Sequence, residues 1–182
     1  MHPRLAEIVR YVDERRADLE MAASKLPYER WAARPSSNSW SVAEVFDHLH
    51  LSESGIARLL VKRIARAKEA GLGPETSTES AMNALDFFPV VDGPKRQAPE
   101  IVVPRAEARA PGVHEALRRS RADLHAALQD GDGLALGEVT ATHPALGVIN
   151  LYQWILFVGH HEARHTRQVE QIVRDLAASN VR

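Results

Sequence analysis

The chain has 182 residues, of which 45% are hydrophobic and 26% are charged, and these proportions exclude wholesale disorder. Its formal net charge of −1 provides no basic field for nucleic acid or for an anionic membrane surface. The absence of cysteine excludes disulfides, thiolate catalysis and every zinc or iron–sulfur site that needs a cysteine ligand. We therefore expect one globular domain that spans residues 1–182.

Apolar runs in the chain are short. The longest, from Trp154 to Val158, falls far below the roughly 20 residues that span a bilayer. The first residues lack the apolar region of a secretory signal peptide. The sequence therefore predicts a cytoplasmic protein with no membrane partner.

Two helices are predicted in the first part of the chain. Apolar residues at spacings of three, four and seven indicate one buried helix face between Leu5 and Leu26, and a loop follows over residues 27–39. A second helix is expected to begin at Ser41 and to stop near Gly71.

The start of the second helix carries a strong local signal. Ser41 and Glu44 have the spacing of a capping box, in which each side chain accepts a hydrogen bond from the other residue's backbone N–H. Trp40 precedes the cap, where it is expected to pack on Val45 as a hydrophobic staple.

The second half of the chain predicts two more long helices. Residues 72–111 are rich in proline and are expected to be irregular, apart from a short helix over residues 78–87. Helical patterns follow over residues 112–129 and 148–178, and no segment alternates with period two for long enough to predict a sheet. Four amphipathic helices in one domain predict an all-α fold, a four-helix bundle.

Histidines are the candidate functional residues of the last helix. His161 and His165 are four residues apart and therefore share one face, whereas His160 falls outside it. The same face carries Gln168 one turn further on. Because the other residues of this face are apolar, the histidine pair is expected to point toward the core. These apolar residues are Leu151, Trp154, Val158, Ile172 and Leu176.

A histidine pair at this spacing is a common way to present two imidazoles to one metal ion. The alternative is a pair of core histidines that hydrogen bonds satisfy. Burial favours a shared partner, because unpaired buried polar groups are costly. His48, at the inner edge of the second helix, is the candidate third ligand, and its alternative is a boundary histidine without metal. The remaining single histidines, His50, His114, His125 and His143, are expected to be solvated.

Two motifs resemble a known family. Residues 40–49, WSVAEVFDHL, are similar to the W-S-x-x-E-x-x-x-H-L signature of the DinB-like superfamily, which includes the YfiT-type proteins. Residues 161–168, HEARHTRQ, resemble its C-terminal H-x-x-x-H-x-x-Q element. The resemblance extends from Leu5 to about Leu176.

The resemblance implies a four-helix bundle with up-down-down-up connectivity and a divalent metal, such as zinc or nickel, held by His48, His161 and His165. Activities assigned in the family include metal-dependent thiol transfer with bacillithiol or mycothiol, maleylpyruvate isomerisation and hydrolysis. The implied partner is a small-molecule substrate, a low-molecular-weight thiol among the candidates, and exposed helix faces would permit a homodimer.

Three histidines leave a divalent ion with at least one position for water or substrate, which favours a reactive site over a structural one. Gln168 is a candidate to orient a ligand or bound water, and Glu162, Asp47 and Glu44 are candidates to accept an imidazole N–H. The alternative for each is a solvated polar residue, or in the case of Glu44 a helix cap. Two interpretations stay open at this point. One is a metal-dependent enzyme, either a thiol S-transferase or a hydrolase, and the other is a non-catalytic metal-binding or structural bundle.

Overall fold

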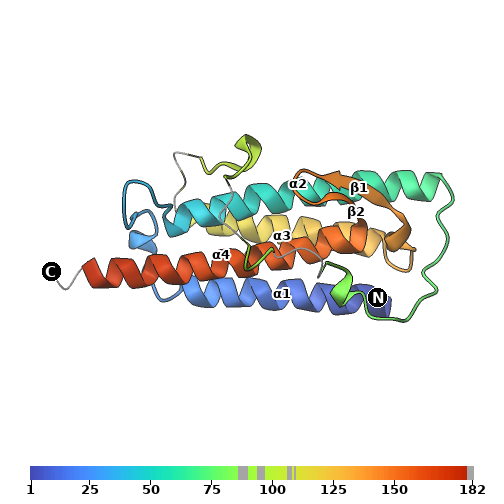
Figure 1. The fold of residues 1–182 in the computed structure, drawn as a ribbon, viewed down its shortest axis with the longest axis horizontal. Coiled ribbons are helices and arrows are strands. Elements are labelled where there is room, and N and C mark those ends of the chain that lie inside the picture. Colours follow the sequence, from blue (N-terminus) through green and yellow to red (C-terminus); the bar gives the residue numbers. More distant parts are fainter. Residues whose placement is uncertain (86–89, 94–96, 106–107, 109, 180–182) are drawn as a thin grey trace.

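The computed structural model describes residues 1–85, 90–93, 97–105, 108 and 110–179. Four long helices lie side by side in an elongated bundle, which confirms the predicted all-α fold (Figure 1). They are α1 (Pro3–Ala23), α2 (Val42–Glu69), α3 (Gly112–Asp130) and α4 (Leu151–Ser179). Short 3-10 helices lie at Tyr28–Arg30, Met82–Leu85, Glu100–Val102 and Leu136–Glu138. No helix in these described ranges is long and apolar enough to cross a membrane.

The helices associate as two pairs. α1 packs mainly on α4, and α2 packs mainly on α3. The two members of each pair run in the same direction, and the pairs run in opposite directions (Figure 1). Side-chain pairings along the helices agree with these directions. Tyr11 pairs with His160 and Arg16 with Glu162 for α1 and α4, and Glu53 pairs with Ser120 and Lys68 with Asp130 for α2 and α3.

The capping box at the start of α2 is formed as the sequence predicts. The Ser41 hydroxyl accepts a hydrogen bond from the Glu44 N–H at 3.2 Å, and the Glu44 carboxylate accepts one from the Ser41 N–H at 2.8 Å. The Arg34 guanidinium also donates to the Glu44 carboxylate. This cap fixes the first residue of α2, and therefore fixes the direction in which His48 points about two turns further along.

Among the described residues, the core consists of two apolar clusters, one toward each end of the bundle. Each cluster takes side chains from all four long helices. A buried polar layer lies between the two clusters along the chain's helices. It contains Arg16 of α1, Glu53 of α2, Ser120 and Arg121 of α3, and Glu162 of α4.

A β-hairpin precedes α4, where the sequence predicted no sheet. Strands β1 (Thr140–His143) and β2 (Gly147–Asn150) pair antiparallel, with Thr140 opposite Asn150 and His143 opposite Gly147. Each strand has only four residues, too few for a period of two to emerge from the pattern. Gly147 has a φ of 75°, a conformation that glycine adopts without strain at such a turn.

The last helix consequently begins at Leu151, three residues later than the predicted start at residue 148. Asn150 and Gln153 mark this start, because each side chain accepts a hydrogen bond from the other's backbone N–H, at 3.0 and 2.8 Å. The predicted short helix over residues 78–87 is reduced to a 3-10 helix at Met82–Leu85. Its predicted last two residues lie outside the described part of the chain.

We expect Ser41→Ala to lower the free energy of unfolding of the metal-free protein by about 1 kcal/mol, since the N–H of Glu44 loses its acceptor. Chemical denaturation followed by circular dichroism would measure the loss. Ser36→Ala is the control, because its hydroxyl pairs with that of Ser39 at the surface and does not cap a helix. An equal stability of the two variants would contradict this role of Ser41.

Candidate metal centre

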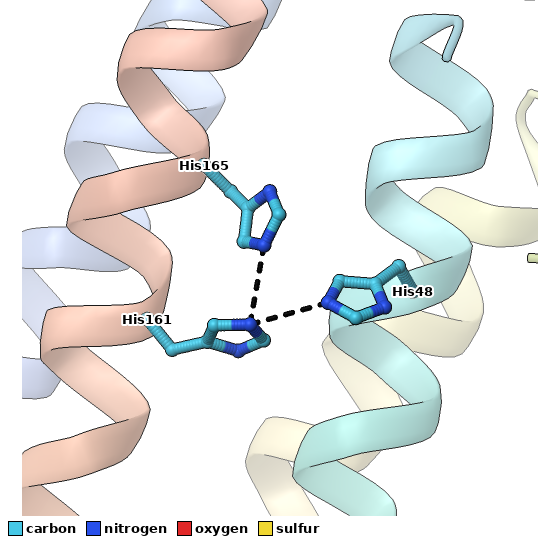
Figure 2. Close-up of side chains that lie close together, drawn as sticks. All are labelled: His48, His161 and His165. Carbon is cyan, nitrogen blue, oxygen red and sulfur yellow. Dashed lines mark hydrogen bonds between the residues drawn. The ribbon is translucent and has the colours of Figure 1, made fainter. Parts of the chain in front are cut away.

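Three histidines from two helices converge on one point. His48 reaches it from α2, and His161 and His165 reach it from α4 (Figure 2). The Nε2 atom of His161 lies 3.1 Å from the Nε2 atom of His48 and 3.1 Å from that of His165. One ligand nitrogen from each ring lies within 4.8 Å of the other two. The structure therefore brings together the three residues that the sequence singled out.

Hydrogen bonds on the far side of two rings orient them. The Nδ1–H of His48 donates to the backbone carbonyl of Val102 at 2.7 Å, and the Nδ1–H of His165 donates to the Gln168 side-chain carbonyl at 2.8 Å. A neutral imidazole carries one hydrogen, so the Nε2 atoms of His48 and His165 are left with lone pairs. Both lone pairs point toward the common centre, as they do in metal-binding histidines.

The three Nε2 atoms have too few hydrogens to satisfy one another by hydrogen bonds, which favours a cation at the centre. Two of the three Nε2 atoms carry lone pairs, and the third, on His161, can offer at most one hydrogen while the ring is neutral. One hydrogen cannot satisfy both neighbours in full at 3.1 Å each. A divalent ion between the three nitrogens would satisfy all of them at once. Zinc–nitrogen bonds of about 2.0–2.1 Å in a tetrahedral shell place nitrogens about 3.3 Å apart, close to the 3.1 Å that separates Nε2 of His161 from each of its two neighbours.

Burial keeps the three rings neutral. His48 and His165 are buried, with 4% and 8% of their surfaces exposed, and His161 is half-buried. Desolvation lowers the pKa of His48, and it lowers the pKa of His165 to about 3. The pKa of His161 lies well below its usual range, first through desolvation and then through the neighbouring His165 and His48. Neutral imidazole is the form that binds a metal ion.

Aromatic rings enclose the centre on two sides. The ring of Phe157 stacks on His161 with a centroid distance of 5.2 Å and an angle of 15° between the planes. The ring of Trp40 lies 5.1 Å from that of His48 and 6.3 Å from that of His165. Trp40 was expected to pack on Val45 as a staple, and it packs against the apolar cluster to which Val45 belongs. Its second role, as a wall against two histidines, was not foreseen.

The predicted supporting residues divide into those that lie at the centre and those that do not. Gln168 lies where it was expected, on Nδ1 of His165. Glu162 was a candidate to accept an imidazole N–H, and the structure corrects this: its two carboxylate oxygens bind Arg16 and Arg121. The reason is helical geometry, because one residue after His161 the side chain turns about 100° toward the bundle axis.

Two other acidic candidates also bind arginines. Glu44 is held in the capping box and by Arg34. Asp47, fully buried, accepts hydrogen bonds from the backbone N–H of Arg105 at 2.8 Å and from its guanidinium. Asp47 therefore acts on His48 indirectly, because it anchors the loop that carries Val102. The Val102 carbonyl was missed by sequence reasoning, since a backbone group has no signature in the sequence.

His143 was expected to be solvated, and this expectation was wrong. Only 8% of its surface is exposed, and the centroid of its ring lies 4.8 Å from that of Trp154 and 4.5 Å from that of Phe157. Its Nδ1 accepts hydrogen bonds from the N–H groups of Ala145 and Leu146, and burial lowers its pKa to about 4. His143 therefore packs against Phe157, and the ring of Phe157 in turn stacks on that of His161. The unpredicted hairpin accounts for the error.

His50 and His160 lie apart from the centre, as the helical phases predict. His50 pairs with Ser54 on the same helix. The Nδ1 atom of His160 is hydrogen-bonded to the Tyr11 hydroxyl at 2.8 Å, on the side of α4 that faces α1.

Comparison with known proteins identifies the family. The model of the DinB superfamily matches residues 11–169, which is most of the chain, and the protein therefore belongs to this superfamily. The chain is also similar to a protein of Bacillus subtilis (strain 168) named Uncharacterized protein YuaE. The two are 27% identical over 150 residues, which cover 79% of this chain and 83% of that protein. No solved structure matches the chain.

We expect the metal-free protein to lose stability as the pH falls from 7 to 5. In the folded state the pKa values of His143 and His165 are lowered to about 4 and about 3, whereas an unfolded histidine has a pKa of about 6.5. Below pH 6.5 the unfolded state therefore binds more protons, and unfolding becomes more favourable. Urea denaturation at several pH values would measure the slope.

The variant His143→Gln is the control for this pH dependence, since it removes one of the lowered pKa values and should reduce the slope. A stability that is constant or rises as the pH falls from 7 to 5 would contradict the neutral, buried state of these histidines.

Proposed function

We propose that this DinB-superfamily protein binds one divalent metal ion through the Nε2 atoms of His48, His161 and His165 and uses it to act on a small molecule. The observation that carries the proposal is the convergence of three imidazoles, two of which have their lone pairs fixed toward the centre by Val102 and Gln168. Zinc and nickel are both compatible with this set of nitrogen ligands.

The chain contributes position and environment. Val102 and Gln168 hold two ligand rings in place, and burial keeps the rings neutral. Trp40 and Phe157 keep water away from two sides of the centre. A divalent ion held by three protein ligands would supply a Lewis acid with at least one exchangeable position, able to activate water or a thiol.

The reaction class we propose is thiol S-transfer of the bacillithiol or mycothiol type, or hydrolysis. Both reactions need an ion with an open position and a nucleophile that comes from solution. Since the chain has no cysteine, a thiol nucleophile would have to be a separate small molecule. The family membership supports this range of activities for the chain.

The alternative is a non-catalytic, structural role. Its support is that two of the three histidines are buried and that the cluster joins α2 of one helix pair to α4 of the other. An ion at this point would cross-link the two pairs. A large rise in melting temperature on metal addition, without any thiol-dependent or hydrolytic turnover, would favour this alternative.

Replacement of His48, His161 or His165 with Ala should abolish most metal binding, because two imidazoles bind a divalent ion far more weakly than three. Metal content of protein purified without an affinity tag, measured by elemental analysis, tests this. His50→Ala and His160→Ala are controls and should keep the wild-type content, since their rings lie away from the cluster. Equal metal content in all five variants would contradict the proposed site.

An activity screen separates the two reaction classes. The metal-loaded protein would be incubated with an electrophile in the presence and absence of a low-molecular-weight thiol, and with ester and amide substrates. We expect the wild-type protein to turn over substrate and the variant His161→Ala not to. Removal of the metal from wild-type protein should abolish turnover, and addition of metal should restore it. Dependence on the thiol would indicate S-transfer, and turnover without thiol would indicate hydrolysis. No turnover under any condition would favour the structural alternative.

A further inference from the structure

Four buried charges form a closed ring in the polar layer between the two apolar clusters. Arg16 donates to Glu53 at 2.9 Å and to Glu162 at 2.7 Å. Arg121 donates to the other oxygen of each carboxylate, at 2.6 Å to Glu53 and at 2.8 Å to Glu162. No side chain in this set has more than 9% of its surface exposed. We call Arg16, Glu53, Arg121 and Glu162 the charged ring.

Each member of the charged ring comes from a different helix. The carboxylates lie on α2 and α4, which are the two helices that carry the histidines, and the arginines lie on α1 and α3. Because α4 packs mainly on α1 and α2 packs mainly on α3, the ring joins the two helix pairs. The three histidines span the same junction, with His48 on one side and His161 and His165 on the other.

The ring and the histidines are also neighbours. Glu162 directly follows His161, and a cavity of about 10 Å³ between α2 and α4 is lined by His161, Glu162 and Glu53 among others. Because the ring and the histidines lie at neighbouring levels of α2 and α4, the distance between these two helices at the ring also determines how close His48 comes to His161 and His165.

A buried ring of charges fixes the relative positions of its helices more than it stabilises the folded state. Buried ion pairs recover little more than the desolvation they cost, and apolar replacements of similar volume are often neutral or stabilising. Each guanidinium, however, bridges two carboxylates in a fixed fork, which sets the distance and rotation between the two partners. Apolar side chains impose no such fixed geometry.

We propose that the charged ring is the positioning device of the metal centre: it holds α2 and α4 at the separation and rotation at which His48, His161 and His165 meet one ion. This inference rests on the proposed function, because it concerns the geometry of the proposed site. Its members are positioning residues and do not touch the ion.

The test uses a variant in which the whole ring is replaced by apolar residues, Arg16→Met, Glu53→Leu, Arg121→Met and Glu162→Leu together. This variant leaves no unpaired buried charge, so it should fold and melt at or above the wild-type temperature. We expect it to bind Co²⁺ about tenfold or more weakly than wild type and to show a changed visible absorption spectrum, which reports the coordination geometry.

The matched control replaces an ion pair far from the site, with Arg4→Met and Glu75→Leu together. Arg4 donates to Glu75 at 2.7 Å near the other end of the bundle, and the histidines are not involved. We expect this control to lose stability, because the Tyr152 hydroxyl and the Ser77 N–H lose their acceptor on Glu75, while it keeps the wild-type Co²⁺ affinity and spectrum.

An apolar-ring variant that folds and binds Co²⁺ with wild-type affinity and spectrum would overturn the inference. If that variant does not fold, Arg121→Lys decides: it keeps the charge, but one ammonium group does not reproduce the two-carboxylate fork. We expect Arg121→Lys to weaken Co²⁺ binding and alter the spectrum, and an unchanged affinity and spectrum would overturn the inference.

The wild-type titration separates the two levels of the proposal. If wild-type protein does not bind Co²⁺, the proposed function fails and the inference falls with it. If wild-type protein binds Co²⁺ and the ring variants bind it equally well, only the positioning role fails.

Discussion

Charges buried in the middle of the bundle constrain the arrangement of its helices. An ion removed from water without a partner costs several kcal/mol, so the two arginines and two glutamates of the charged ring have to meet. They sit on four different helices, and a slide or rotation of any one helix would unpair a charge. The apolar clusters above and below contain mostly aliphatic side chains, which tolerate alternative packings more readily. The register of α2 and α4, and with it the meeting of the histidines, follows from this constraint.

The irregular segment between α2 and α3 adds a second level of control. Its described parts hydrogen-bond to both histidine-bearing helices: Val90 and Gly93 accept from Arg164 of α4, at 3.0 and 2.8 Å, and Val102 accepts from His48 of α2. Arg105 ties the same segment to Asp47. Three of these contacts use backbone carbonyls of the segment, which any residue type would provide. The contacts therefore depend on the course of the backbone more than on the identity of the side chains. A loop that looks featureless in sequence thus orients one of the three candidate ligands.

The sequence predicted those parts of the fold and site that depend on local patterns. The capping box of Ser41 and Glu44, the long helical stripes and the shared face of His161 and His165 are all set by residues close together in the chain. The contributions of the Val102 carbonyl and of His143 depend on segments that meet only after folding, and no local pattern encodes them.

The charged ring was also missed, although the sequence holds a signal for it. Each ring residue lies four positions after a buried apolar residue of its helix, as Arg16 follows Val12 and Glu53 follows Leu49. A charge inside an apolar stripe has to find a partner, and four such charges of balanced sign on four helices indicate a network. The pattern identifies the members of such a network, whereas the pairing among them requires the structure.

The association of α1 with α4 has a consequence for the order of folding. α2 and α3 can dock on each other before the last part of the chain is made, but the apolar face of α1 lacks its main partner until α4 has left the ribosome. Contacts between segments so far apart in sequence form slowly, because the long intervening chain has to be closed into a loop first. His161 and His165 lie on that same helix, so the three histidines can meet only after α4 has docked on the rest of the bundle.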